Sequence, residues 1–384
     1  MILYGKGGSF ISPNSSDYEK ISFAEKYAIN GDIEKAVISF FIMMDENPFS
    51  LSLERCNGFG SAEQFAKQDI VELYYAFFDD HKALSDYIPI RQNLTAEEKR
   101  IGRMIEEFSD TLGLAQTAEE FFLSVKDFYV TYGVGSFGIN KAFYMQDDGS
   151  LTPVSHIKEA RFEDIYGYET QKQKLIQNTA AFASGGSANN VLLYGDSGTG
   201  KSTSIKAVIN EFFDKGIRII QIAKHQFMHL GKLTETLKVR NYRFILYMDD
   251  LSFEDFETEY KYLKAAIEGG LEEKPENVLI YATSNRRHLI KETFSERDGD
   301  DLHRNESIQE KISLSDRFGL SIFYPKPMQA EYFDIVLFLA EKAGFESDRD
   351  TIIAEARKWA VAHGGYSGRC ATQFIAQYKI NNLD

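Results

Sequence analysis

The chain has 384 residues, a formal net charge of −15 and a hydrophobic content of 43%, so it is long enough for two or three domains with sizeable cores. Only two cysteines occur, Cys56 and Cys370, which predicts a reducing compartment and excludes a disulfide framework. The longest apolar run, residues 36–44, is too short to span a bilayer, and residues 1–11 lack the features of a signal peptide. We therefore expect a cytoplasmic protein with no membrane partner.

The negative charge is concentrated in the front of the chain. Residues 1–150 contain 13 basic and 24 acidic residues. An acidic surface repels the nucleic-acid backbone at long range, so nucleic acid is not the favoured partner. The sequence leaves room for a local basic groove in the second part of the chain. The simpler interpretation of the acidic front half is that its charge keeps the protein soluble.

Residues 18–48 predict two helices joined by the turn Asn30-Gly31-Asp32, which also supplies a helix cap. Six residues of this hairpin match the second part of one tetratricopeptide repeat at its spacings: Ala24, Tyr27, Gly31, Ala36, Phe40 and Pro48. The sequence has no second copy at a period of about 34 residues, and a repeat array needs about three. An ordinary αα-hairpin is the simpler interpretation, and a peptide-binding array is the less favoured one.

Three further helices with apolar stripes are predicted in the front part of the chain, at residues 64–81, from 95 onward and at 117–130. Thr95 and Glu98 are placed as a capping box that opens the second of them. The Gly-rich, turn-like stretch 133–154 predicts a linker. No catalytic constellation precedes residue 150. We therefore expect residues 1–150 to form an all-α domain that binds a partner or regulates.

The rest of the chain alternates strands with helices. Buried strands are predicted at 191–194, 217–222, 243–248, 277–283 and 320–324. This order is typical of a parallel, doubly wound sheet, which binds ligands at the carboxyl ends of its strands. We expect a five-stranded αβα core over residues 151–326. Three closing helices, at 330–343, 349–363 and 368–380, predict a helical lid over residues 327–384.

A phosphate loop follows the first of these strands, with the pattern G-x-x-x-x-G-K-[ST]. Its glycines let successive N–H groups point into one concavity that fits an anion, and the helix that starts near Gly200 aims its positive end at the same place. Lys201 can reach the β- and γ-phosphates, and the Ser202 hydroxyl can join a Mg²⁺ shell. The predicted nucleotide-binding residues are Gly195, Asp196, Ser197, Gly198, Thr199, Gly200, Lys201, Ser202 and Thr203.

Two acids end the strand at 243–248. We assign Asp249 to the metal together with Ser202, because Mg²⁺ prefers hard oxygen ligands and usually keeps waters. Asp250 is then placed to orient or deprotonate the attacking water. Glu254 is the alternative base.

Asn285 follows the fourth strand, where an amide can bond both the γ-phosphate and the attacking water. Thr283 is the alternative for this role. Arg369, at the start of the last helix, can contact phosphate in the same subunit and close the lid over nucleotide.

Arg317 stands just before the fifth strand. A guanidinium there can reach a neighbouring subunit's γ-phosphate and stabilise transition-state charge. The alternative is a structural salt bridge to Asp316 or Asp301.

In this order, the motifs resemble the AAA+ ATPase superfamily over roughly residues 160–384. The resemblance implies binding of ATP and ADP with Mg²⁺, an αβα core with a helical lid, catalysis at the subunit interfaces of a homo-oligomer, and an adenine that lies near Ile165 and Gly167. At finer grain, four strings look like one uncharacterised bacterial AAA+ family, domain of unknown function 815: Asp249-Asp-Leu-Ser-Phe-Glu254, Ala282-Thr-Ser-Asn-Arg-Arg-His-Leu289, Leu314-Ser-Asp-Arg-Phe-Gly319 and Ser367-Gly-Arg369.

Two positions depart from the superfamily's pattern. Many relatives carry Glu where this chain has Asp250, one methylene shorter, which is compatible with slow or differently aligned hydrolysis. Phe227-Met-His-Leu-Gly231 only loosely matches the pore loop of protein-threading relatives, and its spacing fits a core-facing helix better.

A basic cluster follows Asn285, before a charged loop at 292–310. We interpret it as a subunit-interface patch, with nucleic-acid contact as the alternative. Its residues are Arg286, Arg287, His288 and Lys291.

The favoured function is an ATPase that hydrolyses ATP to ADP and phosphate and remodels a protein or protein–nucleic acid partner held by the acidic N-terminal domain. The alternative is a nucleotide-gated adaptor with slow hydrolysis. A small-molecule phosphotransferase is disfavoured because the sequence shows no second substrate pocket. A DNA-loading factor is disfavoured by the net acidity.

Overall fold

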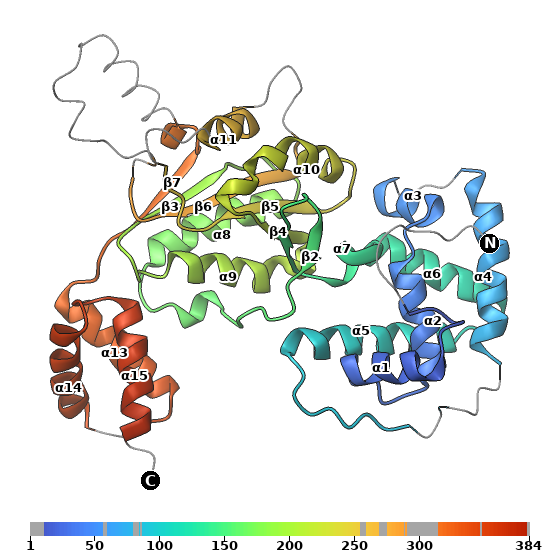
Figure 1. Cartoon of the computed structure of the whole chain (residues 1–384), viewed down its shortest axis with the longest axis horizontal. Coiled ribbons are helices and arrows are strands. Elements are labelled where there is room, and N and C mark those ends of the chain that lie inside the picture. Colours follow the sequence, from blue (N-terminus) through green and yellow to red (C-terminus); the bar gives the residue numbers. More distant parts are fainter. Residues whose placement is uncertain are drawn as a thin grey trace. The chain divides into compact units, whose positions relative to one another are not determined.

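The computed structural model describes residues 11–56, 60–79, 84, 87–253, 259–268, 275–287, 289, 314–345 and 348–381. The chain divides into two compact units, whose elements are labelled in Figure 1. The first, here called the helical unit, consists of Met1–Phe143, Pro153–Ile157 and Val239–Tyr242. The second, here called the sheet unit, consists of Tyr144–Thr152, Lys158–Lys238 and Arg243–Asp384.

The helical unit is built on helices with apolar faces that share one core. Ala24 and Tyr27 of the first helix and Ala36 and Phe40 of the second are all buried in it, and the rings of Tyr27 and Phe40 lie 5.7 Å apart. The tetratricopeptide-like residues therefore pack the two helices of one hairpin against each other. The helices are α1 (Asp17–Tyr27), α2 (Ile33–Met44), α3 (Pro48–Cys56), α4 (Ala62–Phe77), α5 (Ala96–Gly113), α6 (Ala118–Tyr132) and α7 (Gly135–Ile139).

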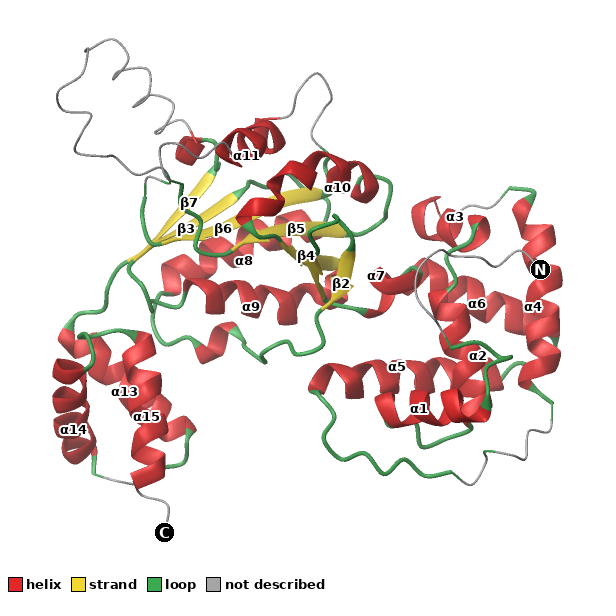
Figure 2. Ribbon diagram, in the orientation of Figure 1, coloured by secondary structure: helices red, strands yellow, loops and turns green. Residues whose placement is uncertain are grey.

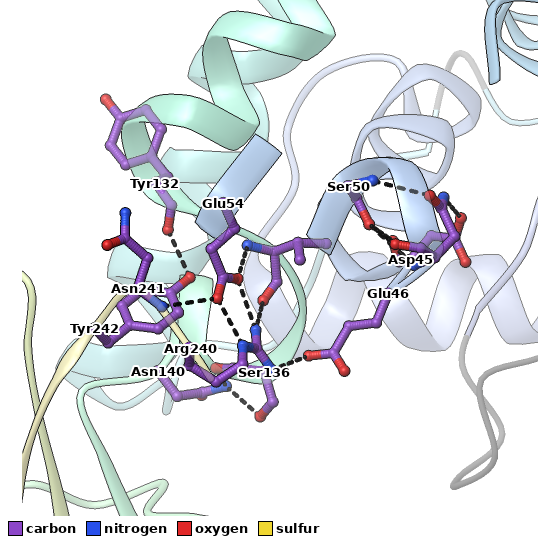
Figure 3. A network of polar contacts seen from close by, with 12 residues as sticks. Asp45, Glu46, Ser50, Glu54, Tyr132, Ser136, Asn140, Arg240, Asn241 and Tyr242 are labelled. Atoms are coloured by element: carbon purple, nitrogen blue, oxygen red, sulfur yellow. Dashed lines mark hydrogen bonds and ion pairs between the residues drawn. The ribbon is translucent and has the colours of Figure 1, made fainter. Parts of the chain in front are cut away.

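A buried ion-pair network organises one end of the helical unit, and Figure 3 shows it. Arg240, from the segment Val239–Tyr242, forms two parallel bonds to Glu54 of α3, at 2.6 Å and 2.7 Å. It also donates to Glu46 at 2.9 Å and to the backbone carbonyl of Val134 at 2.9 Å. The side chains of Arg240 and Glu54 are only 7% and 2% exposed, so this pair is a desolvated, bidentate contact of the strong kind.

Seven strands form one sheet in the order β2-β1-β4-β5-β6-β3-β7. β3, which precedes the phosphate loop, lies between β6 and β7 and pairs with both in parallel. β5 also pairs in parallel with β4 and β6, so the five predicted strands form the expected doubly wound sheet. The strands are β1 (Ala142–Met145), β2 (Leu151–Pro153), β3 (Val191–Gly195), β4 (Ile217–Gln221), β5 (Arg243–Met248), β6 (Val278–Ser284) and β7 (Leu320–Tyr324).

Residues 133–154, which we predicted as a turn-like linker, contain regular structure and a boundary between the two units. This stretch instead forms α7 and the neighbouring strands β1 and β2. The turn between the strands was correctly predicted: Gly149 has a φ of 81°, and the N–H of Gln146 donates to the carbonyl of Ser150 at 2.8 Å. The two strands are only 4 and 3 residues long, too short to show an alternating pattern in the sequence.

Helices cover both faces of the sheet, as Figure 2 shows for α8 and α9 on one side and α10 and α11 on the other. Three closing helices, α13, α14 and α15, pack around their own core and form the helical lid. None of the helices in the described residues has the length and apolar character needed to cross a membrane. The remaining elements are α8 (Glu169–Ala183), α9 (Lys201–Phe212), α10 (Leu230–Leu237), α11 (Glu259–Glu268), α13 (Gln329–Lys342), α14 (Arg349–Ala362), α15 (Gly368–Asn381), η1 (Phe162–Asp164), η2 (Phe213–Lys215) and η3 (Lys224–His229).

Candidate functional site

The phosphate loop connects β3 to α9, and its glycines are required by geometry. Gly195 has a φ of 138°, and a Cβ there would lie 2.0 Å from the carbonyl oxygen of Tyr324 on β7. Gly200 has a φ of 97° at the N-cap of α9, a conformation that side chains rarely adopt. The loop therefore turns sharply enough to aim the N-terminal N–H groups of α9, and the positive end of its dipole, into the site.

Lys201 is buried and folds back over this loop. Its Nζ donates to the carbonyls of Gly195 at 2.7 Å and Asp196 at 2.6 Å, and to Oδ1 of Asn285 at 3.2 Å. Burial lowers the pKa of Lys201, while the carboxylates of Asp250 and other acids oppose that shift. An anionic ligand is the natural partner of a cation that is held by carbonyls alone.

Asp249 is the hub of a second cluster, at the end of β5. Its Oδ1 accepts from the hydroxyls of Ser202 at 2.8 Å and Thr283 at 2.6 Å. Burial alone would raise the pKa of Asp249, but the nearby hydroxyls of Thr283, Tyr247 and Ser202 lower it. The carboxylate therefore stays ionised at neutral pH.

The donors around Asp249 fit Mg²⁺ better than a softer metal. A carboxylate and a hydroxyl are hard oxygen ligands, and Mg²⁺ is usually held by one or two such groups, waters and substrate phosphates. The described residues contain no group of three or more His, Cys, Asp or Glu side chains that could hold a metal by themselves. A metal at Ser202 and Asp249 would therefore depend on the phosphates of a nucleotide.

Asp250 has the left-handed backbone that sequence patterns do not reveal, with a φ of 52°. Its N–H donates to Oγ1 of Thr283 at 2.9 Å, which fixes this turn. Its Oδ1 accepts from Nδ2 of Asn285 at 2.7 Å. Lys201, Asn285 and Asp250 thus form one continuous polar chain across the site.

These residues line a cavity of about 790 Å³ between the phosphate loop and the lid. Its polar end holds residues 197–203, Asp249, Asp250, Thr283 and Asn285, and its lid side holds Arg369. Gly167, Gly195 and Asp196, which we also predicted at the nucleotide, are absent from the described lining, although Lys201 bonds to the carbonyls of the last two. The apolar residues of the lining include Ile165, Tyr166, Ile335, Phe338 and Leu339.

The lid touches the phosphate loop directly. The N–H of Arg369, at the start of α15, donates to the carbonyl of Gly198 at 3.2 Å. A Cβ on Gly198, whose φ is 75°, would lie 2.9 Å from Cβ of Arg369. Only glycine fits this approach, so Gly198 links the loop to the lid.

Arg317 lies apart from the described lining of this cavity. Its Nε donates to a carboxylate oxygen of Glu268, at the end of α11. We expected Asp316 or Asp301 as a structural partner; Glu268 takes this place, and Asp301 lies outside the described residues. An arginine that contacts the nucleotide of a neighbouring subunit has to lie outside its own cavity, and Arg317 meets this condition.

Several other predicted residues are absent from the described lining of this cavity. The side chains of Arg286 and Arg287 are exposed, whereas Glu254, His288, Lys291 and the loop 292–310 lie outside the described residues. Phe227, in η3, is 1% exposed and lies 6.3 Å from the ring of Phe253. The core-facing interpretation of Phe227 is therefore confirmed.

Two residues have places in the site that no motif indicates. Thr283, which we named as the alternative to Asn285, donates its hydroxyl to Asp249 and accepts from the N–H of Asp250. Tyr247, on β5 two residues before Asp249, carries a buried hydroxyl whose pKa is raised by burial and by the Asp249 carboxylate. The apolar run that predicts β5 hides this tyrosine among core residues.

Comparisons with known proteins give a family match and distant structural matches. The model of the family described as "Protein of unknown function (DUF815)" matches residues 139–382. The RuvB Holliday junction branch migration motor of Thermotoga maritima is 16% identical, with a TM-score of 0.36, and the match covers 59% of this chain and 76% of that chain. A mutant form of the same protein is 15% identical, with a TM-score of 0.37 over the same shares. No curated protein matches the sequence.

Proposed function

This chain belongs to the DUF815 family of proteins of unknown function, and from its own site we propose that it is an AAA+ ATPase. It binds ATP with Mg²⁺ in the cavity between the phosphate loop and the lid, and hydrolyses it to ADP and phosphate. The observation that carries this proposal is the polar chain from Lys201 through Asn285 to Asp250. This chain connects Lys201, which would bind phosphate, to Asp250, which would act as the base, within one cavity.

The cavity suits the two ends of ATP. The triphosphate lies on the N–H groups of the loop and of the first turn of α9, and Lys201 exchanges its loop carbonyls for β- and γ-phosphate oxygens. The adenine lies against the apolar lining residues Ile165, Phe338 and Leu339. Apolar walls with a few polar groups are typical of a nucleotide pocket of this size.

Hydrolysis uses the polar residues at the end of the sheet. Water attacks the γ-phosphorus as its bond to the bridging oxygen breaks, and ADP leaves with that electron pair. Asp250 takes the proton of the water, and Asn285 holds this base in line through its 2.7 Å bond. Mg²⁺, when held by Ser202 and Asp249, supplies charge neutralisation at the β- and γ-phosphate oxygens.

Two arginines complete the site from different subunits. Arg369 reaches the phosphates of its own subunit from the lid, because its backbone already lies on Gly198. Arg317 reaches the γ-phosphate of the next subunit, because it lies away from its own cavity. Full activity therefore needs a homo-oligomer, and an arginine supplied in this way is worth about 10³- to 10⁵-fold in turnover in other phosphoryl-transfer enzymes.

Hydrolysis drives remodelling of a protein or protein–nucleic acid partner. We assign partner recognition to residues 1–150, nucleotide chemistry to 151–326 and lid motion to 327–384. The acidic character of residues 1–150 favours a partner with basic segments. The small number of cysteines favours a reducing compartment, and we propose the cytoplasm as the location.

A nucleotide-gated adaptor with slow hydrolysis is the second candidate. Two observations favour it: Asp250 carries the shorter acid, and Phe227 is buried in the core where a threading loop would expose an aromatic. Such a protein would bind its partner in the ATP state and release it after one slow turnover. Such a protein would signal its nucleotide state to the partner through movement of the lid and would need no pore.

Phosphate release by the purified full-length chain, measured over a range of protein concentrations, tests the activity. The expected result is a specific activity that rises with protein concentration, because the Arg317 site is shared between subunits. Affinity capture with Asp250→Asn in ATP then identifies the partner. If the chain is a remodelling ATPase, addition of that partner should stimulate turnover. If it is an adaptor, turnover should stay unchanged. No phosphate release at any concentration would contradict the ATPase proposal.

A further inference from the structure

Three tyrosines lie on the same side of the sheet, in the core that α8 and α9 cover. Tyr247, Tyr281 and Tyr324 belong to one apolar cluster, and Tyr247 pairs in register with Tyr281 on the neighbouring strand. The Tyr281 hydroxyl bonds Thr179 at 2.9 Å and Asn178 at 3.0 Å. The Tyr324 hydroxyl bonds Ser204 at 2.9 Å.

Tyr247 differs from the other two. Its side chain is 4% exposed, yet its hydroxyl is buried without a hydrogen-bond partner among the described residues. Its nearest polar neighbours are Asp249, which raises the pKa of Tyr247, and the Ser202 and Thr283 hydroxyls, which lower it. A buried hydroxyl without a partner destabilises the folded chain, and a phenylalanine would fill the same space without that cost.

The neighbouring carboxylate explains why a hydroxyl is placed here. Asp249 Oδ1 already accepts from both Ser202 and Thr283. Binding of a metal by Ser202 and Asp249 would turn the Ser202 oxygen and the carboxylate toward the ion. A carboxylate that serves a metal is normally held in place by further donors, and loss of such a donor weakens the metal about 10- to 100-fold.

We propose that Tyr247 is a positioning residue for the Mg²⁺ site: its hydroxyl donates to the Asp249 carboxylate in the nucleotide-bound protein and holds it toward the metal. This inference rests on the proposed function. In the free protein the hydroxyl has no partner among the described residues, and Asp249 Oδ1 accepts from Ser202 and Thr283. The tyrosine therefore costs stability in the free state and contributes only when metal and nucleotide are present.

The test compares Tyr247→Phe with Tyr281→Phe in the full-length chain. ADP affinity is measured by calorimetry in EDTA and again in excess Mg²⁺, and the thermal midpoint is measured without nucleotide. Tyr247→Phe should keep the wild-type ADP affinity in EDTA, lose about tenfold or more of the Mg²⁺-dependent gain, and unfold at the wild-type temperature or above it. Tyr281→Phe, which removes a bonded hydroxyl, should unfold earlier and keep the Mg²⁺-dependent gain.

The outcomes separate the two proposals. An unchanged Mg²⁺ gain in Tyr247→Phe would overturn the role of this tyrosine and leave the ATPase proposal standing. A Tyr247→Phe chain destabilised as much as Tyr281→Phe would also overturn it, because the hydroxyl would then serve the free fold. A wild-type chain that binds no ADP, with or without Mg²⁺, would overturn both.

Discussion

Arg317 and Glu268 form an ion pair within the sheet unit, in which Arg317 Nε donates to a Glu268 carboxylate oxygen. Both side chains are partly exposed, at 25% and 39%. In a single chain the proposed interface arginine is thus held by its own α11. A neighbouring subunit's γ-phosphate has to compete with a carboxylate for it, which links assembly to catalysis.

Removal of Arg317 should abolish most turnover and spare nucleotide binding. Arg317→Ala is expected to release phosphate about 10³-fold more slowly than wild type, with ATP affinity unchanged. A mixture of Arg317→Ala and Asp250→Asn chains should recover part of the activity, because some mixed interfaces join an intact Arg317 to an intact Asp250. Activity of the mixture no greater than that of the two variants alone would show that Arg317 does not act across subunits.

Removal of Glu268 should have the opposite effect. Glu268→Gln frees Arg317 from a partly exposed ion pair of the kind worth up to about 1 kcal/mol, so turnover should rise by up to about fivefold at subsaturating protein concentrations. Glu259→Gln, at the other end of α11, is the matched control and should change nothing. A fall in turnover to the level of Arg317→Ala would mean that Glu268 holds the arginine in its working position.

The contact between Gly198 and the lid predicts a selective loss of nucleotide binding. Gly198→Ala places a methyl group 2.9 Å from Cβ of Arg369 and forces a side chain into a φ of 75°. Gly344→Ala is the control, since its φ is 78° and its Cβ would meet open space. Backbone strain should cost both variants about 1–2 kcal/mol of stability, but only Gly198→Ala should weaken ADP binding in calorimetry. Equal ADP affinity in the two would contradict the loop–lid contact.

The Arg240 network predicts a large effect on stability. Arg240→Ala leaves Glu54 buried without its partner, which should cost about 3–5 kcal/mol of unfolding free energy. Arg91→Ala removes the exposed pair with Glu98, whose arginine side chain is 41% exposed, and should cost at most about 1 kcal/mol. Urea unfolding followed by circular dichroism measures both. Similar midpoints for the two variants would show that the buried pair is not needed for the fold.

Local patterns carried most of what the sequence predicted. The phosphate loop, the acids at the end of β5 and Asn285 after β6 each sit at a strand end, and a parallel sheet brings such ends to one edge. The first lid helix, predicted at residues 330–343, forms at Gln329–Lys342. These features depend on residues close together in the chain.

Features that depend on distant residues or on very short elements were missed. Glu268 meets Arg317 across 49 positions of sequence, which no spacing rule indicates. Pro48 starts α3 in the structure, whereas we predicted it as the end of a helical hairpin, because proline suits both a first helical turn and a helix stop. The strands β1 and β2 are too short to show a period.

The affinity of the purified chain for ATP, measured by calorimetry for wild type, Lys201→Ala and the exposed-lysine control Lys174→Ala, tests the nucleotide site most directly. Loss of a buried cation that bonds phosphate should weaken ATP binding about tenfold to hundredfold in Lys201→Ala, with Lys174→Ala equal to wild type. Equal ATP affinity in all three proteins, or no ATP binding by any of them, would contradict the assignment of this cavity to ATP.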